Sequence, residues 1–166
     1  MNNESFRAMR RSRQLLSEEE SIRLLTSATA GVLSLVGDDG YPYGVPLSHV
    51  YSNGKLYFHS ALSGHKVDAV KACAKASFTV IAADDVKPSE FTTYFRSVIC
   101  FGKVRLIEEE TEKMAALREL VARFNPDEGE LNEEIRKGFA RLVMIEFAIE
   151  HISGKEAIEL VRARKA

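Results

Sequence analysis

The segment at residues 63–66 (Ser-Gly-His-Lys) has the residue types that bind phosphate, and it follows the strand-like segment at residues 56–59. This order predicts a helix that begins inside the segment, and a helix N-terminus offers unpaired amides and a partial positive charge to an anion. Gly64 would let the backbone approach closely, Lys66 would add a point charge, and Ser60 a hydroxyl donor. The same pattern also fits a serine cap on an ordinary surface helix, so spacing alone leaves both interpretations open.

The four histidines are the other candidates for chemistry: His49, His59, His65 and His151. Their spacing fits neither HExxH nor a usual zinc pattern, so we expect no metal site. His59 and His65 flank the same strand–helix turn and could face one pocket. Neither a GxSxG elbow nor an acidic orienting residue accompanies the nearby serines, which argues against a hydrolase. The sequence also lacks GxGxxG and Walker-type loops, which argues against Rossmann and P-loop nucleotide sites.

The pattern of apolar residues predicts the elements that must position these side chains. Strands are expected at residues 31–36, 41–51, 56–59, 77–83, 94–107 and 142–149, and helices at 17–26, from 65 onward, at 111–124 and at 131–139. Asn53-Gly54 suits a type I′ hairpin turn, and Pro42 and Pro46 favour an edge position for the second strand. Neighbouring strands with few interposed helices predict an α+β fold, mainly β, whose antiparallel sheet closes as a barrel.

Length and composition predict one globular domain. The chain has 166 residues, 45% of them hydrophobic and 28% charged, and we expect an N-terminal arm at residues 1–16 and a single domain at 17–166. A net charge of −1 argues against nucleic-acid binding. No apolar run reaches the length of a membrane span and no signal-peptide core is present, so we expect no membrane association and a cytoplasmic location.

Two smaller features keep more than one interpretation. The arginines of the arm, Arg7, Arg10, Arg11 and Arg13, fit a solvated segment, or an arm that lies over a partner subunit or an anionic ligand. Cys73 and Cys100 form no CxxC motif, and we expect small apolar core residues rather than a redox pair.

Five segments carry a resemblance to a known family: residues 9–14, 40–48, 56–61, 64–66, and Ser97-Val98 with Gly102. In their order and spacing they resemble the pyridoxamine 5′-phosphate oxidase-like, FMN-binding split-barrel superfamily, and within it the nitroimidazole-resistance (Nim-type) flavoproteins. The resemblance covers about residues 9–154. It implies an antiparallel split β-barrel with flanking helices, FMN as the cofactor, and a homodimer that holds the cofactor at its subunit interface.

The resemblance also implies a set of FMN-binding residues. Lys66 matches the phosphate-binding lysine of the family, aided by His65 and Ser60. The contacts implied around the cofactor are Val45, Pro46, Leu47, Ser48, His59, Ser60, Ala61, Gly64, His65, Lys66, Ser97 and Val98. Residues 45–48 would lie along the isoalloxazine edge, largely through backbone groups. Ser97 stands where the oxidases have a glutamine, so that contact would be weaker or mediated by water.

Taken together, the sequence predicts an FMN-dependent oxidoreductase that acts on a small organic acceptor, such as a nitro-aromatic compound. His65 is expected to touch the substrate as well, because an imidazole can donate a proton near neutral pH. Oxidation of vitamin B6 is disfavoured, because the chain has no tryptophan and its C-terminal tail does not match the substrate-binding segment of true pyridoxamine phosphate oxidases.

Two alternatives stay open. One is a flavin-binding module without turnover. Failure of a nicotinamide donor to reduce the bound flavin would indicate this alternative. The other is a haem-binding or haem-degrading split barrel in which His49 or His151 would be a ligand, and a Soret band would indicate it.

Overall fold

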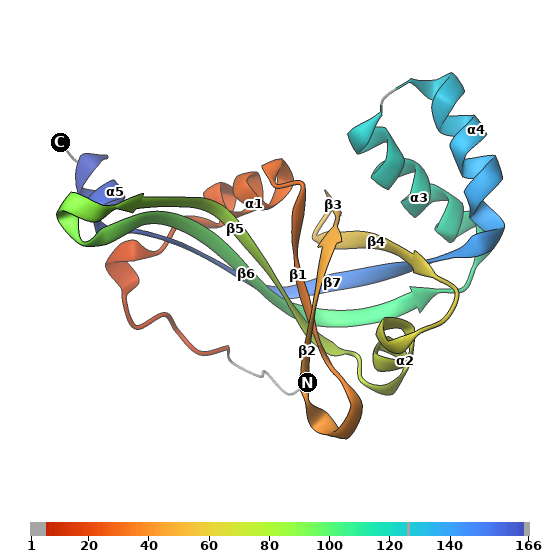
Figure 1. Ribbon diagram of the computed structural model, residues 1–166, viewed down its shortest axis with the longest axis horizontal. Helices are drawn as coiled ribbons and strands as arrows, with labels where there is room; N and C mark the ends of the chain where they lie inside the picture. The colour runs from red at the N-terminus through yellow and green to blue at the C-terminus, as the bar shows by residue number, and fades with distance from the viewer. Residues whose placement is uncertain (1–5, 126, 165–166) are drawn as a thin grey trace.

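The centre of the protein is one seven-stranded antiparallel sheet, with the strand order β2-β1-β5-β6-β7-β4-β3 (Figure 1). The computed structural model describes residues 6–125 and 127–164. Residues 1–5 of the expected arm, Pro126, and residues 165–166 of the expected domain lie outside the described residues. The strands are β1 (Ala30–Val36), β2 (Pro42–Ser48), β3 (Val50–Ser52), β4 (Lys55–Ala61), β5 (Lys75–Lys87), β6 (Thr92–Ile107) and β7 (Leu142–Glu156).

Among the described residues, five α-helices flank this sheet. They are α1 (Glu18–Ser27), α2 (His65–Ala72), α3 (Glu110–Phe124), α4 (Glu128–Gly138) and α5 (Ile158–Ala163). In Figure 1, α3 and α4 stand together at one end of the sheet, and α5 lies at the opposite end beside the turn between β5 and β6. No helix among the described residues is both long enough and apolar enough to cross a membrane. The α+β class, mainly β, is therefore confirmed.

Local sequence signals determine several element ends. Ser17 caps α1, and its side chain and that of Glu20 form the expected capping box. Asn53 and Gly54 both have positive φ angles, of 47° and 80°, as a type I′ turn requires. β2, which contains both prolines, pairs only with β1, so the predicted edge position is confirmed.

The expected strand at residues 41–51 is wrong as one element, and so is the expected hydrogen-bonded closure of the barrel. The chain forms β2 up to Ser48, turns at His49, and continues as β3 at the opposite end of the strand order. One intervening residue spans at most about 7 Å, so the sheet curls until its two edges approach at His49. No ladder joins β2 to β3 among the described residues, because Pro42 and Pro46 have no amide donor and β3 has only three residues.

Two hydrophobic clusters lie on the two faces of the curled sheet. The larger cluster fills the inside of the curl and includes Leu33, Phe58, Phe78 and Phe147, together with Cys100, which forms no disulfide. Leu25 of α1 and Val70 of α2 complete this cluster. The smaller cluster lies on the outer face, where α3 and α4 cover Val50, Ile107 and Met144. The remaining outer face of β1, β5 and β6 has no helix over it (Figure 1).

His49, at the crossing between the sheet edges, is fully buried. Its Nε2 lies 2.9 Å from the carbonyl oxygen of Leu25, so Nε2 donates, while the buried Nδ1 has no hydrogen-bond partner among the described residues. Burial lowers the pKa of His49 and the nearby Arg123 lowers it further, against the opposing effect of the Leu25 hydrogen bond. The folded protein therefore favours the neutral imidazole.

This environment predicts a pH-dependent stability. As the pH falls, His49 takes up a proton in the unfolded protein at a higher pH than in the folded protein. The contribution of neutral His49 to the free energy of unfolding is therefore complete above the unfolded pKa of about 6.5 and is lost as the pH falls below that value. The free energy of unfolding should fall between about pH 7.5 and pH 5.5, with a slope from this group of at most about 1.4 kcal/mol per pH unit. Urea unfolding of the wild type and of His49→Gln across this range measures the effect. Equal slopes in the two proteins would contradict it.

Candidate functional site

The opening of the curled sheet has two rims made of strand edges. Within the described part of the chain, β3 pairs only with residues 55–57 of β4, so residues 58–61 of β4 have a ladder partner there only on the β7 side. The outer edge of β2 likewise has no ladder partner among the described residues. Because His49 joins the two edges, residues 45–48 and residues 58–61 diverge from a common point. The backbone groups on these two edges have no ladder partner among the described residues, and such groups need hydrogen-bond partners. We call the place where the two edges diverge the notch.

The structure brings two groups of predicted contacts to these rims. Residues 45–48 form the β2 rim, with Val45 and Leu47 half-buried and Pro46 and Ser48 exposed. Residues 59–61 form the β4 rim, where Ser60 points inward and is 7% exposed, whereas His59 and Ala61 are exposed. His59 and Ser60 therefore lie on opposite faces of one strand.

The third group of predicted contacts begins helix α2, which follows the β4 rim directly. Gly64 is the N-cap residue with φ of 126°, a conformation that favours glycine. No side chain caps this helix, so its first amides are unpaired. Lys66 is half-buried and forms no hydrogen bond or ion pair with any residue in the described ranges. Burial of its ammonium group lowers the pKa of Lys66.

His65 does not share a pocket with His59. Its ring stacks on Tyr43 of β2, with centroids 4.0 Å apart and an interplanar angle of 16°, and its Nε2 lies 3.8 Å from Oδ2 of Asp38 in the β1–β2 turn. His65 thus connects the start of α2 to the β1–β2 hairpin. The expectation that the two histidines face one pocket is wrong, because the strand pleat directs His59 to the other side.

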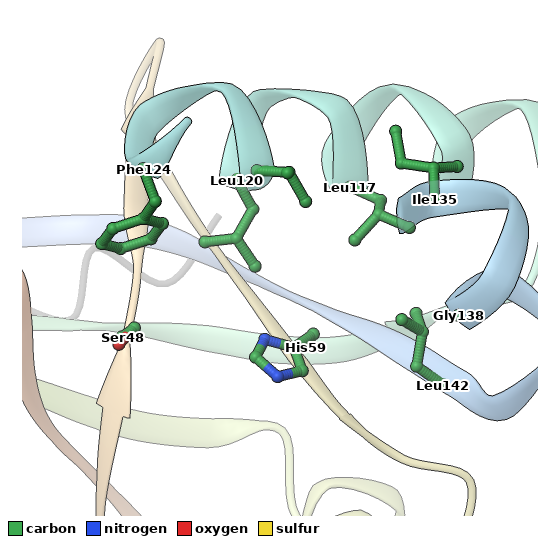
Figure 2. A pocket seen from close by; sticks show the side chains of 9 residues that line it. Ser48, His59, Leu117, Leu120, Phe124, Ile135, Gly138 and Leu142 are labelled. Atoms are coloured by element: carbon green, nitrogen blue, oxygen red, sulfur yellow. The ribbon is translucent and has the colours of Figure 1, made fainter. Parts of the chain in front are cut away.

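His59 instead lines a cavity of about 360 Å³ between the β4 rim and the α3–α4 pair. Figure 2 shows Ser48 and His59 on the strand side and the helices on the other. These two side chains are the polar part of the lining. The apolar part consists of Leu117, Leu120, Val121, Phe124, Ile135 and Leu142, with Gly138 at the end of α4. We call this cavity the rim chamber.

A network of ion pairs holds α3 over the outer face of the sheet. Arg105 Nε donates to Glu146 Oε1 at 2.9 Å, and Lys55 Nζ donates to Glu146 Oε2 at 2.8 Å. The same guanidinium also pairs with Glu112 of α3. Burial raises the pKa of Glu146, but the hydrogen bonds from Arg105 and Lys55 outweigh that effect and hold it below its usual value. Glu146 is therefore charged at neutral pH, and this network fixes the helix that walls the rim chamber.

Ser97 and Val98 lie away from the notch within one chain. They belong to β6, which β7 separates from β4. The side chain of Val98 is fully buried in the inner cluster, whereas Ser97 pairs with Ile81 on β5 and Lys155 on β7.

The proposed haem ligands occupy different environments. His49 is enclosed in the core, as described above, and His151 stacks on Phe6 with centroids 4.8 Å apart. No group of three or more His, Cys, Asp or Glu side chains among the described residues is arranged to hold a metal ion.

Sequence reasoning missed the walls of the rim chamber. Leu117, Leu120, Val121 and Phe124 follow the i, i+3, i+4, i+7 spacing of one helix face, and that periodicity was a detectable signal. This periodicity, however, indicates only that the apolar face of the helix packs against another part of the protein, not that it lines a cavity. The Tyr43–His65 contact joins two segments distant in sequence, so no local pattern indicated it.

Comparisons with known proteins identify the family and agree with the fold. The family model described as pyridoxamine 5′-phosphate oxidase matches residues 17–156. Among curated proteins, no match to the sequence was found. A putative 5-nitroimidazole antibiotic resistance protein from Bacteroides thetaiotaomicron is similar in structure, with a TM-score of 0.71, 21% identity and 86% of each chain covered.

Two further solved structures are described as flavin-binding proteins. A FAD-binding protein from Mesorhizobium loti has a TM-score of 0.62 and 25% identity, covering 87% of this chain and 97% of that one. A FAD and haem binding protein from Mycobacterium smegmatis has a TM-score of 0.73 and 26% identity, covering 87% of this chain and 73% of that one. With most of its length matched by the family model, the chain belongs to the pyridoxamine 5′-phosphate oxidase family of flavin-binding split-barrel proteins.

Proposed function

We propose that the protein binds FMN in the notch and reduces a small organic acceptor, with a nitro-aromatic compound as the leading candidate. The observation that carries the proposal is Lys66, a partly desolvated cation without a counter-charge among the described residues, beside the uncapped N-terminus of α2. A phosphate would accept hydrogen bonds from the free amides and pair with Lys66. The nitroimidazole resistance protein and the flavin-binding proteins among its structural relatives support the same function.

The rims suit the rest of the cofactor. A flavin ring carries carbonyl and N–H groups along one edge, and the free backbone groups of residues 45–48 and 58–61 offer matching partners. A bound flavin, reduced beforehand by a nicotinamide donor, would supply the electrons, and the chain would supply orientation and a partly dry environment.

The rim chamber suits the acceptor. Its apolar walls favour a flat uncharged molecule, and its volume of about 360 Å³ lies at the small end of ligand pockets. His59 and Ser48 lie at the strand side, where the acceptor would meet the rims. We therefore assign the proton donor at the acceptor to His59 and give His65 a positioning role through Tyr43 and Asp38.

A homodimer completes this proposal. The uncovered outer face carries exposed apolar side chains in neighbouring strands, among them Val32, Ile81 and Ile99, which are 36%, 72% and 38% exposed. Register places Val32 beside Thr79 and Thr79 beside Ile99, so this face is continuous across three strands. Such a patch favours association. A second copy seated here would also bring its Ser97 toward the notch, as the family resemblance implies.

Filling the rim chamber tests the assignment of the acceptor site. A Cβ on Gly138 would meet no atom closer than 3.8 Å, and this residue has ordinary αR angles, so Gly138→Phe adds a ring without backbone strain. In protein loaded with FMN and then reduced anaerobically with stoichiometric dithionite, we expect the acceptor concentration that half-saturates flavin reoxidation to rise about tenfold or more, with FMN affinity unchanged. Stopped-flow absorbance with a nitroimidazole acceptor measures the half-saturating concentration, and fluorescence titration of FMN against the apoprotein measures the affinity.

Gly129→Phe provides the control, because Gly129 lies on the same helix outside the chamber lining. Its Cβ would meet only the flexible Asp127 side chain at 3.2 Å. Unchanged saturation in Gly138→Phe would contradict the acceptor site, and equal effects in both variants would contradict it too.

A further inference from the structure

The arginine-rich arm encloses a second cavity, on the opposite side of the molecule from helices α3 and α4. The arm is held at its C-terminal end, where the Leu16 amide donates to the Gly154 carbonyl at 3.0 Å and Gln14 Nε2 donates to the Glu156 carbonyl at 3.0 Å. At its other described end, Phe6 stacks on His151. The arm therefore contacts β7 at both of these points, and we call it the strap; a cavity of about 1090 Å³ lies along it. Figure 1 shows the arm beside the sheet, ahead of α1.

One wall of this strap cavity is aromatic. Phe6 lies almost parallel to His151, with an interplanar angle of 9°, and its centroid is 5.7 Å from that of Phe101. Phe101 and His151 are register partners on β6 and β7, and Phe101 stays 41% exposed. Phe6 and His151 cover one face of each other, but Phe6 itself stays 36% exposed, so the cluster still presents aromatic surface on which a planar heterocycle can stack.

The other wall is basic. Arg7 and Arg10 line the cavity, and neither forms an ion pair or hydrogen bond with any residue in the described part of the chain. Glu18 is the one acidic side chain among the lining residues, which leaves an excess of positive charge. Guanidinium groups bind phosphate in a bidentate geometry. Ser12 also lines the cavity, and its hydroxyl can bond a sugar.

We propose that the strap cavity binds an adenosine diphosphate group, with the purine on the Phe6–Phe101–His151 wall and the pyrophosphate on Arg7 and Arg10. The volume exceeds that of the rim chamber about threefold, which suits a nucleotide better than a small acceptor. Free ADP, a pyridine dinucleotide donor and a dinucleotide flavin all contain this group. The proposal does not depend on FMN binding, because none of the residues in this cavity belongs to the notch.

Binding of ADP to the full-length protein, measured by isothermal titration calorimetry with FMN present and absent, tests the proposal. We expect Arg7→Gln/Arg10→Gln to weaken ADP binding at least about tenfold. The control Arg118→Gln/Arg136→Gln removes the same charge from exposed positions on α3 and α4 and should leave ADP binding unchanged. No ADP binding by the wild type, or equal losses in both double variants, would overturn the proposal.

His151→Ala tests the purine wall separately from the charge. We expect it to weaken ADP binding at least about fivefold while inorganic pyrophosphate binds as before, since stacking acts only on the base. Equal effects on ADP and pyrophosphate, or no effect on ADP, would overturn the assignment of the base. Competition by NADP⁺ and by FAD against ADP identifies which molecule carries the bound adenosine diphosphate group. If one dinucleotide displaces ADP, that dinucleotide is the ligand of the cavity. If neither displaces ADP, the ligand is the free nucleotide.

Discussion

Lys66→Ala is expected to weaken FMN binding by about 1.5–3 kcal/mol, or roughly 10- to 100-fold in Kd. In the proposed complex, the ammonium group and the free amides of α2 share the phosphate charge. Removing the ammonium leaves only the amides and the partial charge of the helix terminus. Since Lys66 has no ion pair among the described residues, its loss leaves no orphaned partner, and the unfolding midpoint should change little. Fluorescence titration of FMN against the apoprotein measures the Kd.

The matched control is Lys71→Ala, on the same helix. Lys71 is exposed and lies in the last turn of α2, at the end of the helix dipole that repels anions. Its removal changes the net charge of the protein equally but should leave FMN affinity within about twofold of the wild type. Equal losses in the two variants would show a general charge effect and contradict the phosphate site.

Gly102→Ala is expected to lower the free energy of unfolding by about 3 kcal/mol or more. Gly102 lies at the irregularity in the β6–β7 ladder, where a Cβ would come within 2.1 Å of the Ala148 carbonyl oxygen and 3.0 Å of Phe147 Cε1. The oxygen belongs to a backbone inside the central sheet and the ring to the inner cluster, so neither can move freely. Urea unfolding followed by far-UV circular dichroism measures the difference.

Gly138→Ala makes the same chemical change where a Cβ has ordinary contacts. Alanine is preferred to glycine near a helix end, so the stability of this variant should equal or exceed that of the wild type by up to about 1 kcal/mol. A Gly102→Ala protein as stable as Gly138→Ala would show that the β6–β7 register relaxes. The close contact between β6 and β7 at Gly102 would then be able to widen and accommodate a methyl group.

Much of the fold could be predicted because its signals are local. The Ser17–Glu20 capping box, the Asn53-Gly54 turn and the proline edge strand each depend on a few neighbouring residues, and the structure has all three. The strand ends were harder to predict. β5 continues through Asp84 and Asp85 to Lys87, because its ladder with β6 stabilises residues that a strand otherwise disfavours.

The division at His49 could not be read from the sequence. The residues on both sides of His49 continue a strand-like pattern. The turn depends on a tertiary contact, because the imidazole is buried against Leu25 and Phe78 where the chain passes from one edge of the sheet to the other. The notch follows from that crossing. The sequence indicated residues 45–48 and 59–66 through a family resemblance, but not that strand pleat would place His59 and Ser60 on opposite faces.

The central claim is that the notch binds FMN, and the visible absorption spectrum of the purified protein tests it most directly. We expect flavin bands in the protein as isolated or after incubation with FMN and removal of the excess. Chromophore released by denaturation should be identified as FMN, in a ratio of about one per chain. A colourless protein that takes up no FMN, or one whose chromophore is haem, would contradict the account of the notch.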